Sequence, residues 1–274
     1  MAKRSGSGIT NGGGGGGSAV GGGSGSATQN VQSQATAPQQ APQPQNVAPT
    51  PTRSALDTLQ SMSDDELAAI AQKSKTISMP NQLSDIDDIT QKFVYAANIN
   101  EKPEVLDSAD FDAFMRQNNL TDSDLLSRSI NDIQYTNKSG TKVPMKAQYI
   151  ADMLMYSRYN YIGGKQGGQA LGAGTYFGHR NGQPTGYGSK TIVGVLNPSK
   201  ARVITPGELQ TKAVRFAQTH PKFARAVGAF NTDFIGGKNN MAIYALAMGY
   251  NVIWDSGGRG RTNVIDRSAL VYRK

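Results

Sequence analysis

The stretch Tyr161-Ile-Gly-Gly-Lys-Gln-Gly-Gly-Gln-Ala-Leu-Gly-Ala-Gly-Thr-Tyr-Phe177 joins a glycine-rich segment to the start of a strand. It departs from two common nucleotide-binding motifs. Lys165 is followed by Gln where a phosphate loop has Ser or Thr, and Gly172-Ala-Gly174 lacks the third glycine of a dinucleotide fingerprint. Without Cβ atoms, Gly172 and Gly174 allow a flat ligand to approach the backbone, and Tyr176 adds an aromatic face. A glycine-rich loop that enters a buried strand has the same pattern.

On both sides of this stretch, short β-branched runs alternate with amphipathic runs. Strands are predicted at 125–130, 174–177, 191–196 and 201–204, helices at 146–157, from Thr205 onward, at 222–227 and at 241–248, and a final hairpin from 251–254 and 262–272. This order predicts an α+β domain over 121–274, with a split, mostly antiparallel sheet and flanking helices.

The preceding residues, 55–120, form a predicted acidic helical segment. Helix-starting patterns begin at Ser63, Ser84 and Ser108, the first of them as the capping box Ser63-Asp-Asp-Glu66. Aspartates in first turns are explained by the helix dipole, so they do not require a metal or an acid–base pair.

Residues 1–54 are predicted to be a disordered tail. They contain no acidic and no aromatic residue, and a Gly/Ser-rich part is followed by a Gln/Pro-rich part. Met1-Ala-Lys-Arg4 is not followed by the apolar core of a secretory signal, and no apolar run of about 18 residues predicts a membrane helix. We therefore expect a soluble protein with a long tether and no membrane partner.

Composition and charge restrict the chemistry. With no Cys and 2 His, the chain of 274 residues offers no thiolate metal site, disulfide or Cys nucleophile, and no metal site is expected. Residues 55–127 carry 14 acidic and 5 basic residues, whereas 128–274 carry 6 and 20. The basic half would suit an anionic partner, or the two halves simply complement each other.

The motif Gly172-Ala-Gly174-Thr-Tyr176-Phe177, with Tyr187 and the strand Lys190-Thr-Ile-Val-Gly-Val-Leu-Asn-Pro198, resembles the nicotinamide-pocket block of ADP-ribosyltransferases. Ser127-Arg128-Ser129 resembles the first-strand arginine of the toxin-like branch. The stretch from Leu125 to Lys274 is also similar to ADP-ribosyltransferase-like proteins encoded by tailed bacteriophages. The resemblance implies an ADP-ribosyltransferase-like fold, NAD as substrate and a host protein as the target.

The resemblance also implies roles for individual residues. Tyr176 and Tyr187 would sandwich the nicotinamide ring, the backbone at Gly172 and Gly174 would hold its carboxamide, and Arg128 would contact the diphosphate. Cleavage of the nicotinamide–ribose bond develops positive charge on the ribose, so the site also needs a carboxylate.

That carboxylate is the point at which the chain departs from the family. The family has a Glu near the start of a late strand, but after Phe234 the chain has only Asp255 and Asp266, and Thr262 aligns with the Glu position. We assign the role to Asp266, because Asp255 lies at the rim of a predicted turn, where Asp is common.

Two other functions stay open. The chain could be a phage particle component with a catalytically degenerate domain, found in the virion or in the host cytoplasm. It could also bind nucleic acid through Lys138, Lys142, Lys146, Arg259 and Arg261. These bases are scattered over helix and turn positions without a recognition motif, so we expect solvated surface and no nucleic-acid partner.

Overall fold

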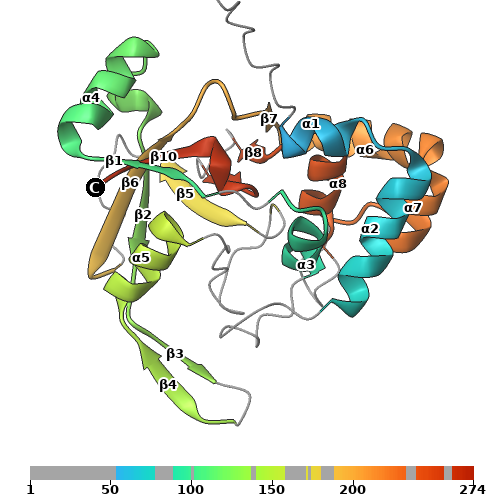
Figure 1. Cartoon of the computed structure of the whole chain (residues 1–274), viewed down its shortest axis with the longest axis horizontal. Coiled ribbons are helices and arrows are strands. Elements are labelled where there is room, and N and C mark those ends of the chain that lie inside the picture. The colour runs from blue at the N-terminus through green and yellow to red at the C-terminus, as the bar shows by residue number, and fades with distance from the viewer. Residues whose placement is uncertain are drawn as a thin grey trace, which may run out of the picture. The chain divides into compact units, whose positions relative to one another are not determined.

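A mixed sheet of eight strands organises the described part of the chain, in the order β1-β10-β6-β2-β5-β9-β8-β7 (Figure 1). These strands are β1 (Glu104–Leu106), β2 (Leu126–Ile130), β5 (Thr175–His179), β6 (Lys190–Leu196), β7 (Val203–Ile204), β8 (Val252–Asp255), β9 (Arg261–Val264) and β10 (Leu270–Arg273). The β1–β10 and β7–β8 pairs are parallel, and the other neighbouring pairs are antiparallel. The predicted α+β class with a mostly antiparallel sheet is confirmed.

The helices flank this sheet. They are α1 (Ala55–Gln60), α2 (Asp64–Thr76), α3 (Ile89–Ala96), α4 (Ser108–Gln117), α5 (Ala147–Tyr156), α6 (Pro206–Thr219), α7 (Pro221–Val227) and α8 (Met241–Ala247), with short 3₁₀ turns η1 (Asp122–Asp124) and η2 (Arg267–Ala269). The computed structural model describes residues 54–77, 89–99, 102–136, 140–157, 171, 174–179, 188–232, 239–255 and 261–274, which lie in one compact unit. The domain boundary at 120/121 stays a prediction.

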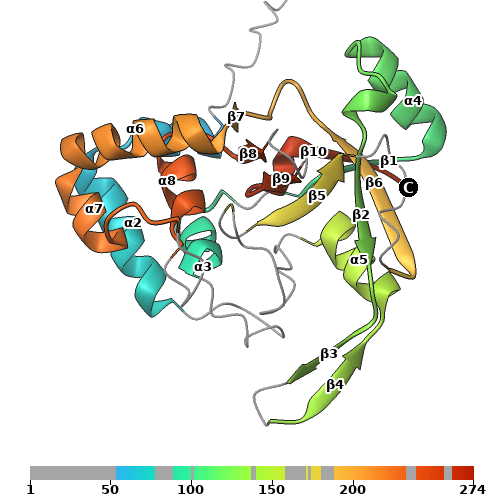
Figure 2. The same cartoon turned by 180° about the vertical axis from the view of Figure 1, so that it is seen from behind.

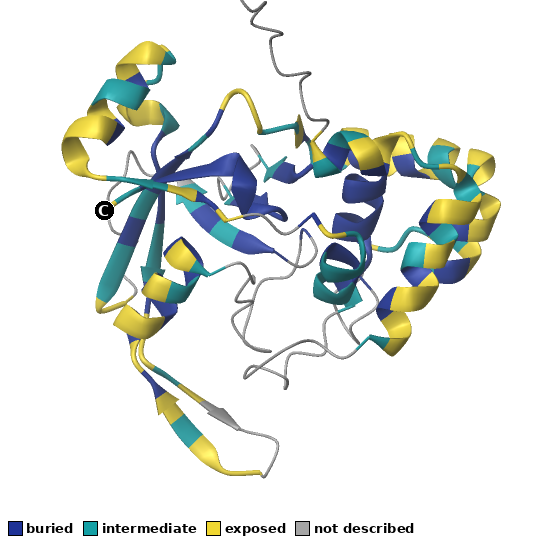
Figure 3. Ribbon diagram, viewed as in Figure 1, coloured by how far each residue is buried: buried dark blue, intermediate teal, exposed yellow. Residues whose placement is uncertain are grey.

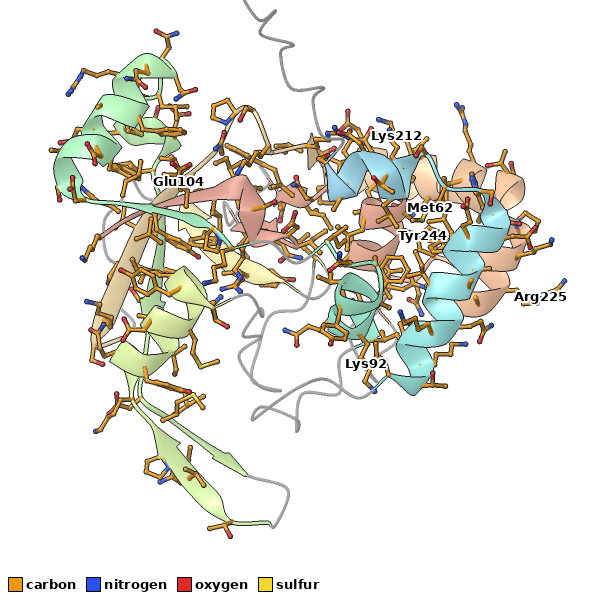
Figure 4. All side chains as sticks on the ribbon, viewed as in Figure 1. Met62, Lys92, Glu104, Lys212, Arg225 and Tyr244 are labelled. Carbon is orange, nitrogen blue, oxygen red and sulfur yellow. The ribbon has the colours of Figure 1, made fainter. Side chains whose placement is uncertain are left out.

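One hydrophobic cluster, the helical core, joins six helices to one edge of the sheet. Apolar side chains of α1, α2, α3, α6, α7 and α8 are buried there with Ile204 of β7 and Ile253 of β8. Tyr244 of α8 is fully buried among them, with its ring 5.3 Å from that of Phe223, and its hydroxyl donates 2.9 Å to the carbonyl of Gly228 (Figure 4). Figure 3 shows α8 buried along its length.

The rest of the sheet is covered by α5 on one face and α4 on the other. Because side chains alternate along a strand, Leu126, Phe177 and Tyr272 point to one face, where α5 packs; we call it the α5 face. On the opposite face, Phe111 of α4 packs against Val195 and neighbouring strand residues. The two views in Figures 1 and 2 show these helices on opposite sides of β6 and β10.

The acidic helical segment is joined to the basic half by specific contacts. Both oxygens of Asp64 accept backbone N–H groups at the start of α7, from Lys222 at 2.9 Å and Phe223 at 2.8 Å. Burial raises the Asp64 pKa, but these two bonds outweigh it and hold the pKa below its ordinary value. Asp65 pairs with Lys222 at 2.6 Å, and Asp57 pairs with Arg202. These contacts support the interpretation that the two halves complement each other.

Strands β3 (Ile133–Thr136) and β4 (Lys142–Met145) form a separate two-stranded sheet, the β3–β4 arm. Both cartoon views show the arm projecting away from the main sheet below α5. At its base, Asp132 pairs with Lys146 at 2.7 Å and accepts the backbone N–H of Ala147 at 2.9 Å. The sequence pattern did not predict this arm, because its strands are only four residues long and Pro144 interrupts the second one.

Several local predictions are confirmed and others are wrong. The predicted capping box at Ser63 starts α2, and the helix predicted from Thr205 onward is α6, which a capping box of Thr205 and Glu208 starts. The cap of α4 is Asp107 instead of Ser108, because the Asp107 carboxylate accepts the backbone N–H of Asp110. The predicted strand 262–272 is interrupted, since η2 separates β9 from β10, and β10 pairs with β6 and β1.

Candidate functional site

Tyr176 lies on β5, half-buried, and its ring packs against the helical core. Its hydroxyl oxygen accepts a hydrogen bond of 3.0 Å from the backbone N–H of Leu171. Its partner across the ladder is Asn263 of β9, whose side-chain amide donates 2.9 Å to the carbonyl of Leu171. Side chains of two neighbouring strands therefore bind both the backbone N–H and the backbone carbonyl of Leu171, the residue directly before Gly172-Ala-Gly174.

Gly174 has a structural reason to be glycine. A Cβ at this position would lie 2.0 Å from Oδ1 of Asn263 and 2.9 Å from the backbone oxygen of Val264. Both distances are below van der Waals contact, so the close approach of β9 excludes a side chain. The predicted contact of this backbone with a carboxamide stays a prediction.

Arg128 and Tyr176 lie on opposite faces of the sheet. Ser127 is paired with Gly178, which shares its face with Tyr176, whereas Arg128 points to the α5 face. The pairing of β2 with β5 covers only Leu126↔His179 and Ser127↔Gly178. A single ligand could therefore contact both Arg128 and Tyr176 only if it passed from one face of the sheet to the other, at the point where the pairing of β2 with β5 ends.

Arg128 is one of three neighbouring polar residues on the α5 face. Arg267 is fully buried, and its guanidinium donates to the carbonyls of Met153, Leu154 and Ser157 at 3.1, 2.5 and 2.8 Å, which caps the C-terminal end of α5. Burial lowers the pKa of Arg267 to about 10, and the nearby charge of Arg128 acts in the same direction. Burial raises the pKa of Tyr272 to about 12, against the pull of both arginines.

Asp266 follows β9 and forms the N-cap of η2. It is 4% exposed, and its oxygens accept the backbone N–H of Ser268 at 3.1 Å and the Ser268 hydroxyl at 2.6 Å. It also lines a pocket of about 150 Å³, together with Asp57, Arg202 and Asn251. The structure thus gives Asp266 a capping role and places it on the α1 side, away from the β5–β9 ladder position of Tyr176.

Asp255 shares a sheet face with Tyr176. It ends β8 and is paired with Arg261, which is itself paired with Gly178. The alternation along β5 then puts Tyr176 on the same face, two strands away from Asp255. Thr262, the residue that the sequence resemblance places at the Glu position, is fully buried opposite Phe177 on the α5 face.

Gly172 and Tyr187 lie outside the described residues. Asn263 was not among the predicted site residues, although it contacts the stretch that was. The only available signal is the register: once β9 is aligned beside β5, Asn263 is the residue opposite Tyr176.

Within the described residues, no group of three or more His, Cys, Asp or Glu side chains is arranged to hold a metal ion, and no helix is long and apolar enough to cross a membrane. A scan against protein-family models, a search of curated proteins and a search of solved structures found no match to the chain.

Proposed function

We propose that this chain has an ADP-ribosyltransferase-like fold and binds NAD, with the nicotinamide end of NAD against Tyr176, and that it transfers ADP-ribose to a host protein. The observation that carries the proposal is the fixed geometry around Tyr176. Its hydroxyl and the Asn263 amide hold the backbone of Leu171 at 3.0 and 2.9 Å. A ring and a backbone held in this way do not have to be ordered when a flat ligand binds.

The proposed reaction breaks the bond between C1′ of the ribose and the nicotinamide nitrogen, and the bonding electrons leave with nicotinamide. A nucleophilic side chain of the target then bonds to C1′ and releases its proton to a base. Positive charge builds up on the ribose at the transition state, so a carboxylate nearby would accelerate the step.

Two carboxylates of the chain compete for this role. Asp266, the residue expected from the sequence, has both oxygens engaged by Ser268. Asp255 shares the sheet face of Tyr176 and is only half-buried. The geometry therefore favours Asp255 as the catalytic carboxylate, and a comparison of the two residues is the decisive test.

The experiment measures NAD binding by calorimetry and nicotinamide release from labelled NAD, with and without bacterial lysate. We expect Tyr176→Ala to weaken NAD binding, and Asp255→Asn to abolish release while binding is retained. Asp266→Asn should leave release per folded molecule unchanged. Tyr156→Phe, at a tyrosine that is 45% exposed on α5, is the matched control. Absence of NAD binding by the wild-type chain would refute the proposal.

A second candidate is a phage particle component whose domain has lost catalysis. The capping bonds of Asp266 favour this candidate, because they occupy the carboxylate to which the sequence analysis assigns the catalytic role. NAD binding without nicotinamide release, in the presence or absence of lysate, would select this candidate. Loss of release in Asp266→Asn alone would restore the original assignment.

A further inference from the structure

Two tyrosines form an exposed aromatic strip on α5. Tyr149 and Tyr156 are 50% and 45% exposed, and they are two of the four exposed large apolar side chains among the described residues. They are seven positions apart, so they share one helix face, with about 10.5 Å between them along the axis. The opposite face of α5 is buried through Ile150, Ala151 and Leu154. Packing of the helix therefore does not require either ring.

Basic side chains lie on the elements that adjoin α5. Lys146, whose side chain is 79% exposed, immediately precedes α5, and Lys142 is exposed on β4 at the turn end of the arm, opposite Thr136. Lys190 starts β6 opposite Ile130, on the α5 face, where β2 leads into the β3–β4 arm. Lys190 therefore lies at the strand end from which the chain enters the arm, although it is more than 40 positions from Lys142 and Lys146 in the sequence.

We propose that α5 and the β3–β4 arm form a binding surface for single-stranded nucleic acid. Single strands are bound by grooves or ridges that combine cations for the phosphates with aromatic rings on which bases stack. The axial rise between the two tyrosines corresponds to about three stacked nucleotides at 3.4 Å each. A duplex keeps its bases stacked inside and cannot use the rings in this way.

This inference does not rest on the proposed NAD chemistry. It revises the expectation that the five basic residues named in the sequence analysis bind no nucleic acid, but only for Lys142 and Lys146, which belong to the proposed surface. Arg261 points to the other sheet face, and Lys138 and Arg259 lie outside the described residues.

Two acidic residues border the surface. Asp132 is paired with Lys146, which leaves that lysine partly neutralised. Asp152 lies on the exposed side of α5 between the two tyrosines, and its carboxylate accepts a bond of 2.9 Å from Gln148. Removing the charge of Asp152 should therefore strengthen binding, a change that only a surface used by an anion would show.

The test measures fluorescence anisotropy of labelled dT15 and rU15 oligonucleotides with the full chain. We expect tighter binding to these than to a 15-base-pair duplex. Tyr149→Ala and Tyr156→Ala should each weaken binding by roughly 5- to 100-fold, because one stacked base is lost. The Phe variants should bind as the wild type does, since they keep the ring. Asp152→Asn should bind more tightly.

The salt dependence of the binding affinity distinguishes the contribution of the lysine charges from that of the tyrosine rings. Lys142→Gln should reduce the slope of log K against log salt by about 0.7, the contribution of one phosphate contact on a single strand. Lys73→Gln, at an exposed lysine of α2, and Val214→Ala, at a 53% exposed valine of α6, are the matched controls and should change nothing. Equal affinity for the duplex, or unchanged affinity in both Tyr→Ala variants, would overturn the proposal and leave a nonspecific polyanion patch or a protein-docking surface.

Discussion

The sharpest test of the β5–β9 contact is Gly174→Ala. The added methyl carbon would lie 2.0 Å from Oδ1 of Asn263 and 2.9 Å from the backbone oxygen of Val264. Displacing Asn263 also breaks its 2.9 Å bond to Leu171. Overpacking costs about 1–3 kcal/mol and the lost bond about 1 kcal/mol, so we expect a loss of ~2–4 kcal/mol. For a folded unit of this size, the melting temperature should fall by roughly 4–16 °C.

The assay is thermal and urea unfolding followed by circular dichroism. Gly207→Ala is the matched control, because nothing lies within 4 Å of its Cβ position in the first turn of α6, and it should be neutral or gain up to about 1 kcal/mol. In the double variant Gly174→Ala/Asn263→Ala, Oδ1 of Asn263 is absent, so the shorter of the two overlaps disappears. The double variant should therefore lose less stability than the two single variants lose together. A Gly174→Ala variant as stable as the wild type, or strict additivity, would refute the reasoning.

Other predictions concern buried and charged groups. Arg267→Met should cost at least about 3 kcal/mol in urea unfolding, because three carbonyls at the end of α5 lose their donor. Tyr272→Phe should be nearly neutral in the same assay, since its hydroxyl has no hydrogen-bond partner among the described residues. Hydrogen bonds from the Ser54 hydroxyl and from Arg202 lower the pKa of Asp57 to about 2, from 3.8. The stabilising contribution of the Asp57 carboxylate should therefore be complete above pH ~4 and disappear as the pH falls toward 2. The free energies of unfolding of wild type and Asp57→Asn, measured against pH, should converge there. A difference that stays constant with pH would contradict this prediction.

Features set by neighbouring residues could be predicted from the sequence. The capping boxes at Ser63 and Thr205 are local, because the serine or threonine and its glutamate are three positions apart. The amphipathic pattern of 146–157 likewise places α5 almost to the residue. In each case the physical cause lies within one or two helical turns.

Features set by pairing across the sheet could not be predicted. The break between β9 and β10 depends on the Asp266 side chain, which bonds Ser268 and caps η2, and not on any local turn residue. The separation of Arg128 from Tyr176 depends on the register of β2 against β5, which one sequence does not reveal. The motif around Tyr176 therefore predicted that this residue lies on a strand, whereas the residues that surround it depend on strand order.

The place of β10 in the sheet has a consequence for how the protein is made. This strand lies between β1 and β6, so Val271 is paired with Glu104 on one side and Val195 on the other. During translation, β1 and β6 leave the ribosome long before their shared neighbour does. Their open edges are available to other chains in that interval. We therefore expect the nascent chain to be at its most aggregation-prone, and most dependent on chaperones, until residues 270–273 have been synthesised and insert between β1 and β6.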